Sequence, residues 1–189
     1  MKKMLDANNK RVFVAIEFPE DIKNYLSKIQ KSIIEESEKG NFTTKENLHL
    51  TLKFIGEVNE SDLEKIKICI DKVALEQNNF QLYFNELGQF PRGNKSIVWV
   101  GLESNEILNE LYSKLEITLE EIGITREERN FKPHITIGRQ VIFNKKFNQI
   151  VEQINIDKLS IPVDKISLME STRVNGELKY IPIHVKKFK

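Results

Sequence analysis

Two short segments of the chain, HLTLKFIG at residues 49–56 and HITIGR at residues 134–139, carry a histidine two residues before a threonine. Side chains two residues apart on a strand share a face, so each segment would present an imidazole beside a hydroxyl. One imidazole can accept a proton while the other donates one, and hydroxyl and guanidinium groups hydrogen-bond phosphate oxygens. The set formed by His49, Thr51, His134, Thr136 and Arg139 therefore indicates phosphate-ester chemistry.

Side-chain alternation decides which residues can accompany the two histidines. Strict alternation puts Phe54 opposite His49 and Lys53 beside it. In the second segment it likewise puts Arg139 on the face opposite His134. Phe54 and Arg139 reach the histidine face only if their strands end or bulge, and the glycine directly before Arg139 suits a bulge.

The two segments belong to a longer internal match. A shift of 85 residues superimposes His49 on His134, and it also matches the apolar positions of the strand and helix that precede each histidine. Two of only three histidines coincide in this alignment. We therefore expect an α+β fold in one domain spanning 1–189, built from two pseudo-symmetric β-α-β-α-β units at about 11–87 and 96–187.

Hydrophobic periodicity and turn residues locate the elements of these units. Strands are predicted at 11–18, 48–54, 80–87, 97–102, 134–137, 159–163, 165–171 and 180–186, with a hairpin turn at Asn175–Gly176. Helices are predicted from 21 to a stop at Gly40, after a capping box at Ser61 and Glu64, over 107–122 and over 143–154. Gly56 is expected to end its strand, and residues 88–94 are expected to form a loop between the two units.

Composition limits the class of protein. The 189 residues are 40% hydrophobic and have a formal net charge of +1, which fits one sizeable core and argues against a polycation. The single cysteine excludes an intramolecular disulfide and suits a reducing compartment. The N-terminal residues MKKMLDANNK lack an apolar stretch, and no segment is long and apolar enough to span a membrane, so we expect a cytoplasmic location.

The remaining candidate residues have structural explanations. His184 has no motif around it, Cys69 lies among apolar helix positions, and the distant histidines have no close metal-ligating partners. No phosphate-binding glycine loop is present, so neither a metal nor a cofactor is expected. Five loop cations near the motifs are either a basic rim for RNA or ordinary solvated charges: Arg92, Lys95, Arg126, Arg129 and Lys132.

The paired motifs resemble those of the two-histidine (2H) phosphoesterases. Within that superfamily the chain is similar to the RNA 2′,3′-cyclic phosphodiesterases, also called 2′-5′ RNA ligases, whose motifs are HxTxxFxG and HxTxxR. Both motifs are complete here. The similarity also covers RVFVAIEFP, LGQFP followed by SIVWVGL, FKPHITIGR, and SLMES with NGELKY, in the expected order.

The resemblance implies a bilobed α+β fold in which two antiparallel sheets face a central cleft and helices lie outside. It implies hydrolysis of a terminal 2′,3′-cyclic phosphate to a 2′-phosphate, with His134 as general base and His49 as general acid. Thr51, Thr136 and Arg139 would bind the phosphate, and Phe54 would either lie near the nucleobase or support the strand. The implied partner is RNA or a nucleotide with a cyclic phosphate end, without a metal, a cofactor or an obligate protein partner.

Two other functions remain open from the sequence. The first is the reverse reaction, which joins a cyclic phosphate to a 5′-hydroxyl and can use the same acid and base. Water at ~55 M favours hydrolysis unless the two ends are aligned. The second is a non-catalytic RNA-binding module, but such modules usually present aromatic residues on a sheet face for base stacking.

Overall fold

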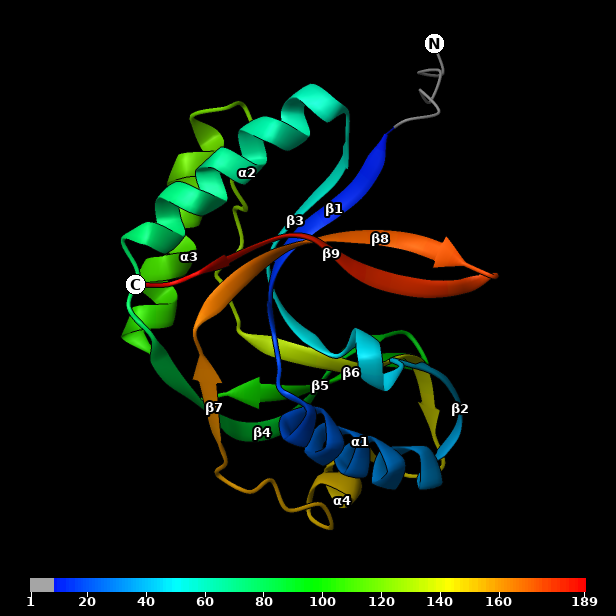
Figure 1. Cartoon of the computed structure of the whole chain (residues 1–189). Coiled ribbons are helices and arrows are strands. Elements are labelled where there is room, and N and C mark those ends of the chain that lie inside the picture. Colours follow the sequence, from blue (N-terminus) through cyan, green and yellow to red (C-terminus); the bar gives the residue numbers. More distant parts are fainter. Residues whose placement is uncertain (1–8) are drawn as a thin grey trace.

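Two antiparallel sheets form the centre of the computed structural model, which describes residues 9–189 (Figure 1). The first sheet has the order β3-β1-β8-β9, from β1 (Lys10–Glu17), β3 (His49–Val58), β8 (Lys165–Val174) and β9 (Glu177–Lys187). The second has the order β2-β6-β5-β4-β7, from β2 (Ser37–Phe42), β4 (Phe80–Arg92), β5 (Lys95–Leu102), β6 (His134–Phe143) and β7 (Ser160–Val163). Every neighbouring pair is antiparallel, which confirms the expected fold class. The expectation about the N-terminal segment falls largely on residues 1–8, outside the described residues.

Within residues 9–189, four α-helices cover the outer faces of the sheets. Helices α2 (Glu60–Leu75) and α3 (Glu106–Glu120) pack on each other and against the first sheet. Helix α1 (Glu20–Glu35) packs on the second sheet, and Figure 1 shows the short α4 (Phe147–Val151) beside it. The periodic apolar positions of α1, from Ile22 to Ile33, are buried between helix and sheet, as the 3.6-residue period predicts. No helix among residues 9–189 is both long and apolar enough to cross a membrane.

The 85-residue offset also relates the elements themselves. Adding it to the bounds of β1 gives those of β5, and adding it to those of β3 gives those of β6. By the same offset β4 corresponds to β8, but each of these two strands joins the sheet of the other unit. Strand β4 pairs with β5, and β8 pairs with β1. The equivalent helices are exchanged too, since α1 lies against β6 and α3 against β3. Neither sheet therefore comes from one continuous half of the chain.

Three predicted boundaries of the first half are wrong. The first helix ends at Glu35 rather than Gly40, and residues 37–42 instead form β2, whose backbone pairs with the edge of β6. Gly56 does not end its strand, because β3 continues to Val58 and the glycine takes up a φ of 99° within it. The N-cap of α2 is Asn59, whose side chain accepts a hydrogen bond from the Asp62 amide, rather than Ser61.

The second half differs from the prediction in the same way. The expected loop at 88–94 is mostly strand, since β4 runs to Arg92 and only Gly93–Asn94 turns the chain into β5. Strand β6 continues to Phe143, which leaves five residues of the predicted helix at 143–154 in α4. Backbone pairing with a neighbouring strand thus extends both elements beyond their local sequence signals.

Candidate active site

A bulge in β3 turns Phe54 to the face that carries His49. Thr51 pairs with Ala15 and Lys53 with Val14, so Leu52 is an extra residue that reverses the alternation. Lys53 consequently points into the core with 5% of its surface exposed, whereas Phe54 is 53% exposed. Strict alternation is therefore wrong for both residues.

Strand β6 bulges at the equivalent position and turns Arg139 outward. Thr136 pairs with Trp99 and Gly138 with Val98, so Ile137 is the extra residue. Gly138 is buried and Arg139 is exposed, as Lys53 and Phe54 are in β3. The prediction that places Arg139 opposite His134 is thus also wrong, for the reason that Gly138 suggested.

Each bulge is supported by a polar side chain from a helix, which is α3 for the bulge in β3 and α1 for the bulge in β6. The side-chain amide of Gln30, on α1, donates 2.7 Å hydrogen bonds to the carbonyl oxygens of Ile137 and Thr43. Glu116, on α3, accepts a 2.7 Å hydrogen bond from the buried Nζ of Lys53. Both bulges are therefore fixed by polar contacts on the core side of their sheets.

The two imidazoles are oriented in the same way by backbone carbonyls. Nδ1 of His49 donates to the Asn47 oxygen and Nδ1 of His134 to the Lys132 oxygen, each at 2.7 Å. Because a carbonyl oxygen only accepts, the neutral ring of each histidine carries its proton on Nδ1 and has a free electron pair on Nε2. The hydroxyl of Thr51 donates to Nε2 of His49 at 2.9 Å. Both Nε2 atoms are thus able to accept or donate a catalytic proton.

Asn47 also ties the β8–β9 hairpin to His49. Its buried side chain donates to the Leu178 oxygen at 2.8 Å and accepts from the Tyr180 amide at 3.0 Å. The residue that orients the imidazole therefore also fixes the strand whose Tyr180 packs against it.

Aromatic rings enclose both imidazoles. Phe13 and Tyr180 lie 4.8 and 5.1 Å from the His49 ring, centroid to centroid. Phe90 and Trp99 lie 5.1 and 6.1 Å from the ring of His134. The indole of Trp99 folds over Gly88, where a Cβ would come within 2.1 Å of it. A glycine at this position in the LGQFP segment is therefore required by the packing beneath His134.

Burial and a shared cation lower the pKa of both histidines. Burial is the largest cause for each, and the hydrogen bond to the backbone carbonyl opposes it. The positive charge of Arg139 also lowers the pKa of both His49 and His134. Strands β3 and β6, which carry the two rings, also contact each other.

A cleft of about 570 Å³ opens beside this group. Among the predicted site residues, His49, Thr51, Phe54 and Arg139 line it. His134 and Thr136 do not line this cleft. They lie on β6 before Arg139, on the face of the second sheet that carries Trp99. Sequence reasoning missed the other lining residues, most of which lie in segments of family resemblance: Arg11, Phe13, Ser171, Thr172, Arg173, Leu178 and Tyr180.

Phe54 contributes an exposed aromatic surface to the cleft. Its ring lies 5.0 Å from the guanidinium carbon of Arg11, within the range of a cation–π contact. The β8–β9 hairpin, which projects from the body of the molecule in Figure 1, provides the facing wall with Leu178 and Tyr180. The cleft thus combines cations suited to phosphate with rings suited to a base or ribose.

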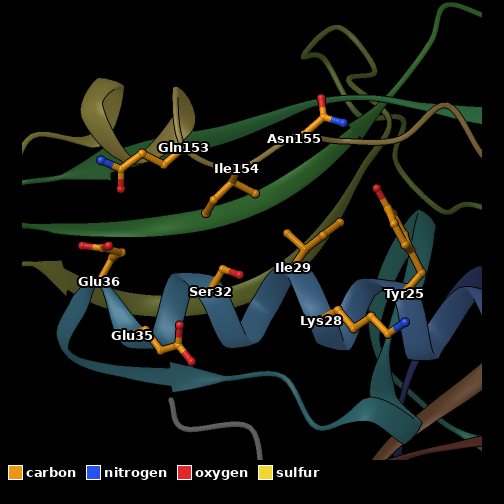
Figure 2. A pocket seen from close by; sticks show the side chains of 9 residues that line it. All are labelled: Tyr25, Lys28, Ile29, Ser32, Glu35, Glu36, Gln153, Ile154 and Asn155. Carbon is orange, nitrogen blue, oxygen red and sulfur yellow. The ribbon is translucent and has the colours of Figure 1, made fainter.

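Other candidate residues lie outside this cleft. His184 bonds Asp71 through Nε2 at 2.7 Å, and the Cys69 thiol is buried and donates to the Thr118 oxygen at 3.4 Å. Figure 2 shows a hollow of about 330 Å³ where α1 residues such as Tyr25 and Lys28 face the segment 153–155. It contains none of the predicted site residues. Within residues 9–189, no group of three or more His, Cys, Asp or Glu side chains comes together as a metal site.

Comparison with known proteins shows the family of this chain. A family model described as the 2′-5′ RNA ligase superfamily matches residues 18–175. The chain belongs to this superfamily. A superfamily relative from Thermotoga maritima, named RNA 2′,3′-cyclic phosphodiesterase, is 31% identical over 163 residues, which are 86% of this chain and 87% of the relative. Another of that name, from Methanocaldococcus jannaschii, is 32% identical over 166 residues, 86% of this chain and 91% of the relative.

Solved structures show the same superfamily fold. Escherichia coli LigT in its apo form has a TM-score of 0.79 at 24% identity, covering 96% of this chain and 99% of LigT. The protein TT0787 of Thermus thermophilus has a TM-score of 0.80 at 22% identity, covering 94% of this chain and 97% of that protein. The resemblance to the superfamily and the α+β fold expected from it are both confirmed.

Proposed function

We propose that this superfamily member is an enzyme that hydrolyses RNA 2′,3′-cyclic phosphate ends to 2′-phosphates. The observation that carries the proposal is the pair of imidazoles on equivalent, contacting strands, each with Nδ1 bonded to a backbone carbonyl so that Nε2 is the atom that exchanges a proton. The names of the relatives at 31% and 32% identity support the substrate. A structure of E. coli LigT complexed with 3′-AMP, at 25% identity, supports a nucleotide as ligand.

In the proposed mechanism, Nε2 of His134 accepts a proton from water as the water oxygen attacks phosphorus. The bond from phosphorus to O3′ breaks, and Nε2–H of His49 donates its proton to that oxygen. Arg139 and the hydroxyls of Thr51 and Thr136 stabilise the charge on the remaining phosphate oxygens. His134 ends the cycle protonated and His49 neutral, and proton exchange with solvent restores both.

The lowered pKa values predict the position of the pH optimum. The base must be neutral and the acid charged, so protonation of His134 lowers the rate on the acid side and deprotonation of His49 lowers it on the alkaline side. Because both pKa values lie below the ordinary value of histidine, about 6.5, we expect kcat/KM to peak below that pH. An anionic phosphate favours charged imidazoles, so kcat should peak at a higher pH than kcat/KM. Steady-state rates across the titration range test this, and the opposite order of the two optima would contradict it.

The direct test of the function is hydrolysis of adenosine 2′,3′-cyclic phosphate in excess EDTA. We expect 2′-AMP as product and a rate within about twofold of the rate without chelator, because no step of this mechanism needs a metal. Chromatography distinguishes 2′-AMP from 3′-AMP. Formation of 3′-AMP would contradict proton donation to O3′, activity restored only by a divalent ion would contradict the mechanism, and absence of hydrolysis would contradict the function.

The 2′-5′ ligation that gives the superfamily its name is the second candidate. In ligation an aligned 5′-hydroxyl takes the place of water: Nε2 of His134 would accept its proton as the oxygen attacks phosphorus, and His49 would donate its proton to O3′ as the bond from phosphorus to O3′ breaks. A nicked duplex with a cyclic phosphate end, compared with the same strand alone, measures the balance between ligation and hydrolysis.

A further inference from the structure

A second hollow of about 360 Å³ adjoins the cleft through a shared side chain. It is lined by Arg92, Lys95, Ser96, Ile97, Arg139 and Gln140, and we call it the hairpin groove because it lies at the β4–β5 turn. Arg139 lines both this groove and the cleft that contains His49. A ligand bound at the cleft can therefore extend into the groove without crossing an uncharged surface.

The groove lies on the catalytic face of the second sheet. Ile97 is two residues from Trp99, and Trp99 pairs with Thr136 on the strand that carries His134. Moving along this face from His134, one meets Thr136, then the bulge with Arg139, and then the hairpin with Lys95 and its neighbours. The order of side chains matches an extended ligand whose end is at the histidines.

The hairpin opposes two cations directly. Arg92 pairs with Lys95 across the Gly93–Asn94 turn, and like charges directly opposite each other destabilise a hairpin. Within residues 9–189, neither they nor Arg139 forms an ion pair with an acidic side chain. The loop cations Arg126 and Arg129, by contrast, pair with Glu120 and Glu127. The hairpin charges thus lack a protein partner and are available to an anion.

The backbone at the inner end of the groove is irregular. Ser96 pairs with Val141 and Val98 with Gly138, so Arg139 and Gln140 together oppose the single residue Ile97. Gln140 has a φ of 52°, a left-handed conformation that non-glycine residues adopt at an energetic cost. The bulge places both polar side chains beside the half-buried, apolar Ile97. The groove therefore offers charge for phosphates and an apolar floor for a sugar or base.

We propose that the hairpin groove binds the nucleotides on the 5′ side of the cyclic phosphate, with Arg92 and Lys95 on their phosphodiester groups. This inference rests on the proposed function, and it assigns single-stranded oligonucleotides rather than mononucleotides as the preferred ligands. Cations that follow the backbone beside apolar surface for the bases are the usual means of binding single strands.

The test compares dissociation constants for two probes, an RNA trinucleotide ending in a 2′-phosphate and 2′-AMP, by calorimetry. The wild type should bind the trinucleotide about 10- to 100-fold more tightly, since each charge-assisted phosphate contact contributes up to about tenfold. In the double variant Arg92→Gln, Lys95→Gln most of this preference should be lost. The slope of log K against log salt for the trinucleotide should also become shallower by about 1.4, or about 0.7 for each lost phosphate contact.

The matched control is Lys28→Gln, Lys31→Gln, which removes two exposed positive charges from α1 on the outer face of the second sheet. It should keep the wild-type preference. Equal binding of both probes by the wild type, or equal loss of preference in the two double variants, would overturn the proposal. Hydrolysis of the cyclic phosphate is assayed on the same samples: preference without hydrolysis contradicts the proposed function, and hydrolysis without preference contradicts the hairpin groove alone.

Discussion

Replacement of His49 or of His134 by alanine is expected to lower kcat/KM by roughly 10²- to 10⁴-fold, the usual contribution of one general acid or base. The two losses should differ in their pH dependence. Without His134 the acid-side limb of the profile should disappear, because no base remains to be protonated. Without His49 the alkaline-side limb should disappear, because no acid remains to lose its proton. Initial rates with adenosine 2′,3′-cyclic phosphate across the pH range measure both effects.

His184→Ala is the matched control for this experiment. His184 lies outside the cleft and bonds Asp71, so its loss removes an imidazole without removing a catalytic proton donor or acceptor. Its rate should stay within about twofold of wild type at a temperature where the fold is intact. Near-wild-type rates in both His49→Ala and His134→Ala would refute the two-histidine mechanism. Loss of the limbs in the opposite order would reverse only the assignment of acid and base.

Lys53→Met should destabilise the fold by about 3–5 kcal/mol, because it leaves the carboxylate of Glu116 buried without its partner. Both side chains are almost fully buried, and Lys53 also donates to the Thr125 oxygen at 2.8 Å. For a chain of this length the midpoint of thermal unfolding should fall by roughly 6–20 °C. Circular dichroism or calorimetry measures the change.

A double-mutant cycle separates the pair from its surroundings. Lys53→Met combined with Glu116→Leu should recover most of the lost stability, since apolar residues can replace a buried ion pair at little cost. Lys65→Met breaks an exposed pair with Asp62 and should change stability by no more than about 0.5 kcal/mol. A single Lys53→Met cost below about 1 kcal/mol would show that the pair is not buried as described.

The ion pair between Lys53 and Glu116 also connects the stability of the fold to the position of His134. Glu116 accepts a 3.0 Å hydrogen bond from the Glu127 amide as well as from Lys53, so the pair holds the segment that leads to Lys132. The Lys132 carbonyl in turn accepts the bond that orients His134. Recovery of stability in the double variant should therefore not be accompanied by full recovery of kcat.

The proposed catalytic set was found in the sequence because residue identity and spacing define it. His49 and His134 stand in matching motifs, and period-two alternation correctly places each threonine beside its histidine. Alternation fails at Phe54 and Arg139, where an extra residue in each strand reverses the faces. The sequence marks the second bulge with Gly138, but the first contains only Leu52 and Lys53, which carry no turn signal.

The pairing of the strands could not be predicted from the sequence, for a different reason. Periodicity states which side of a strand is buried, but it contains no information about the strand on either side. The pairing of β8 with β1 rather than with β5 depends on the whole sheet. The packing of Trp99 on Gly88 likewise becomes visible only once β4 and β5 are aligned.

The exchanged strands determine when the chain can fold during its synthesis. Strand β1 emerges first, but its place in the sheet is between β3 and β8, and β8 begins only at Lys165. At ribosomal rates this delay is on the order of ten seconds, during which one edge of β1 has no partner. An open edge is a template for pairing with other chains. In a nascent chain this edge of β1 therefore stays open to such pairing until β8 has been synthesised.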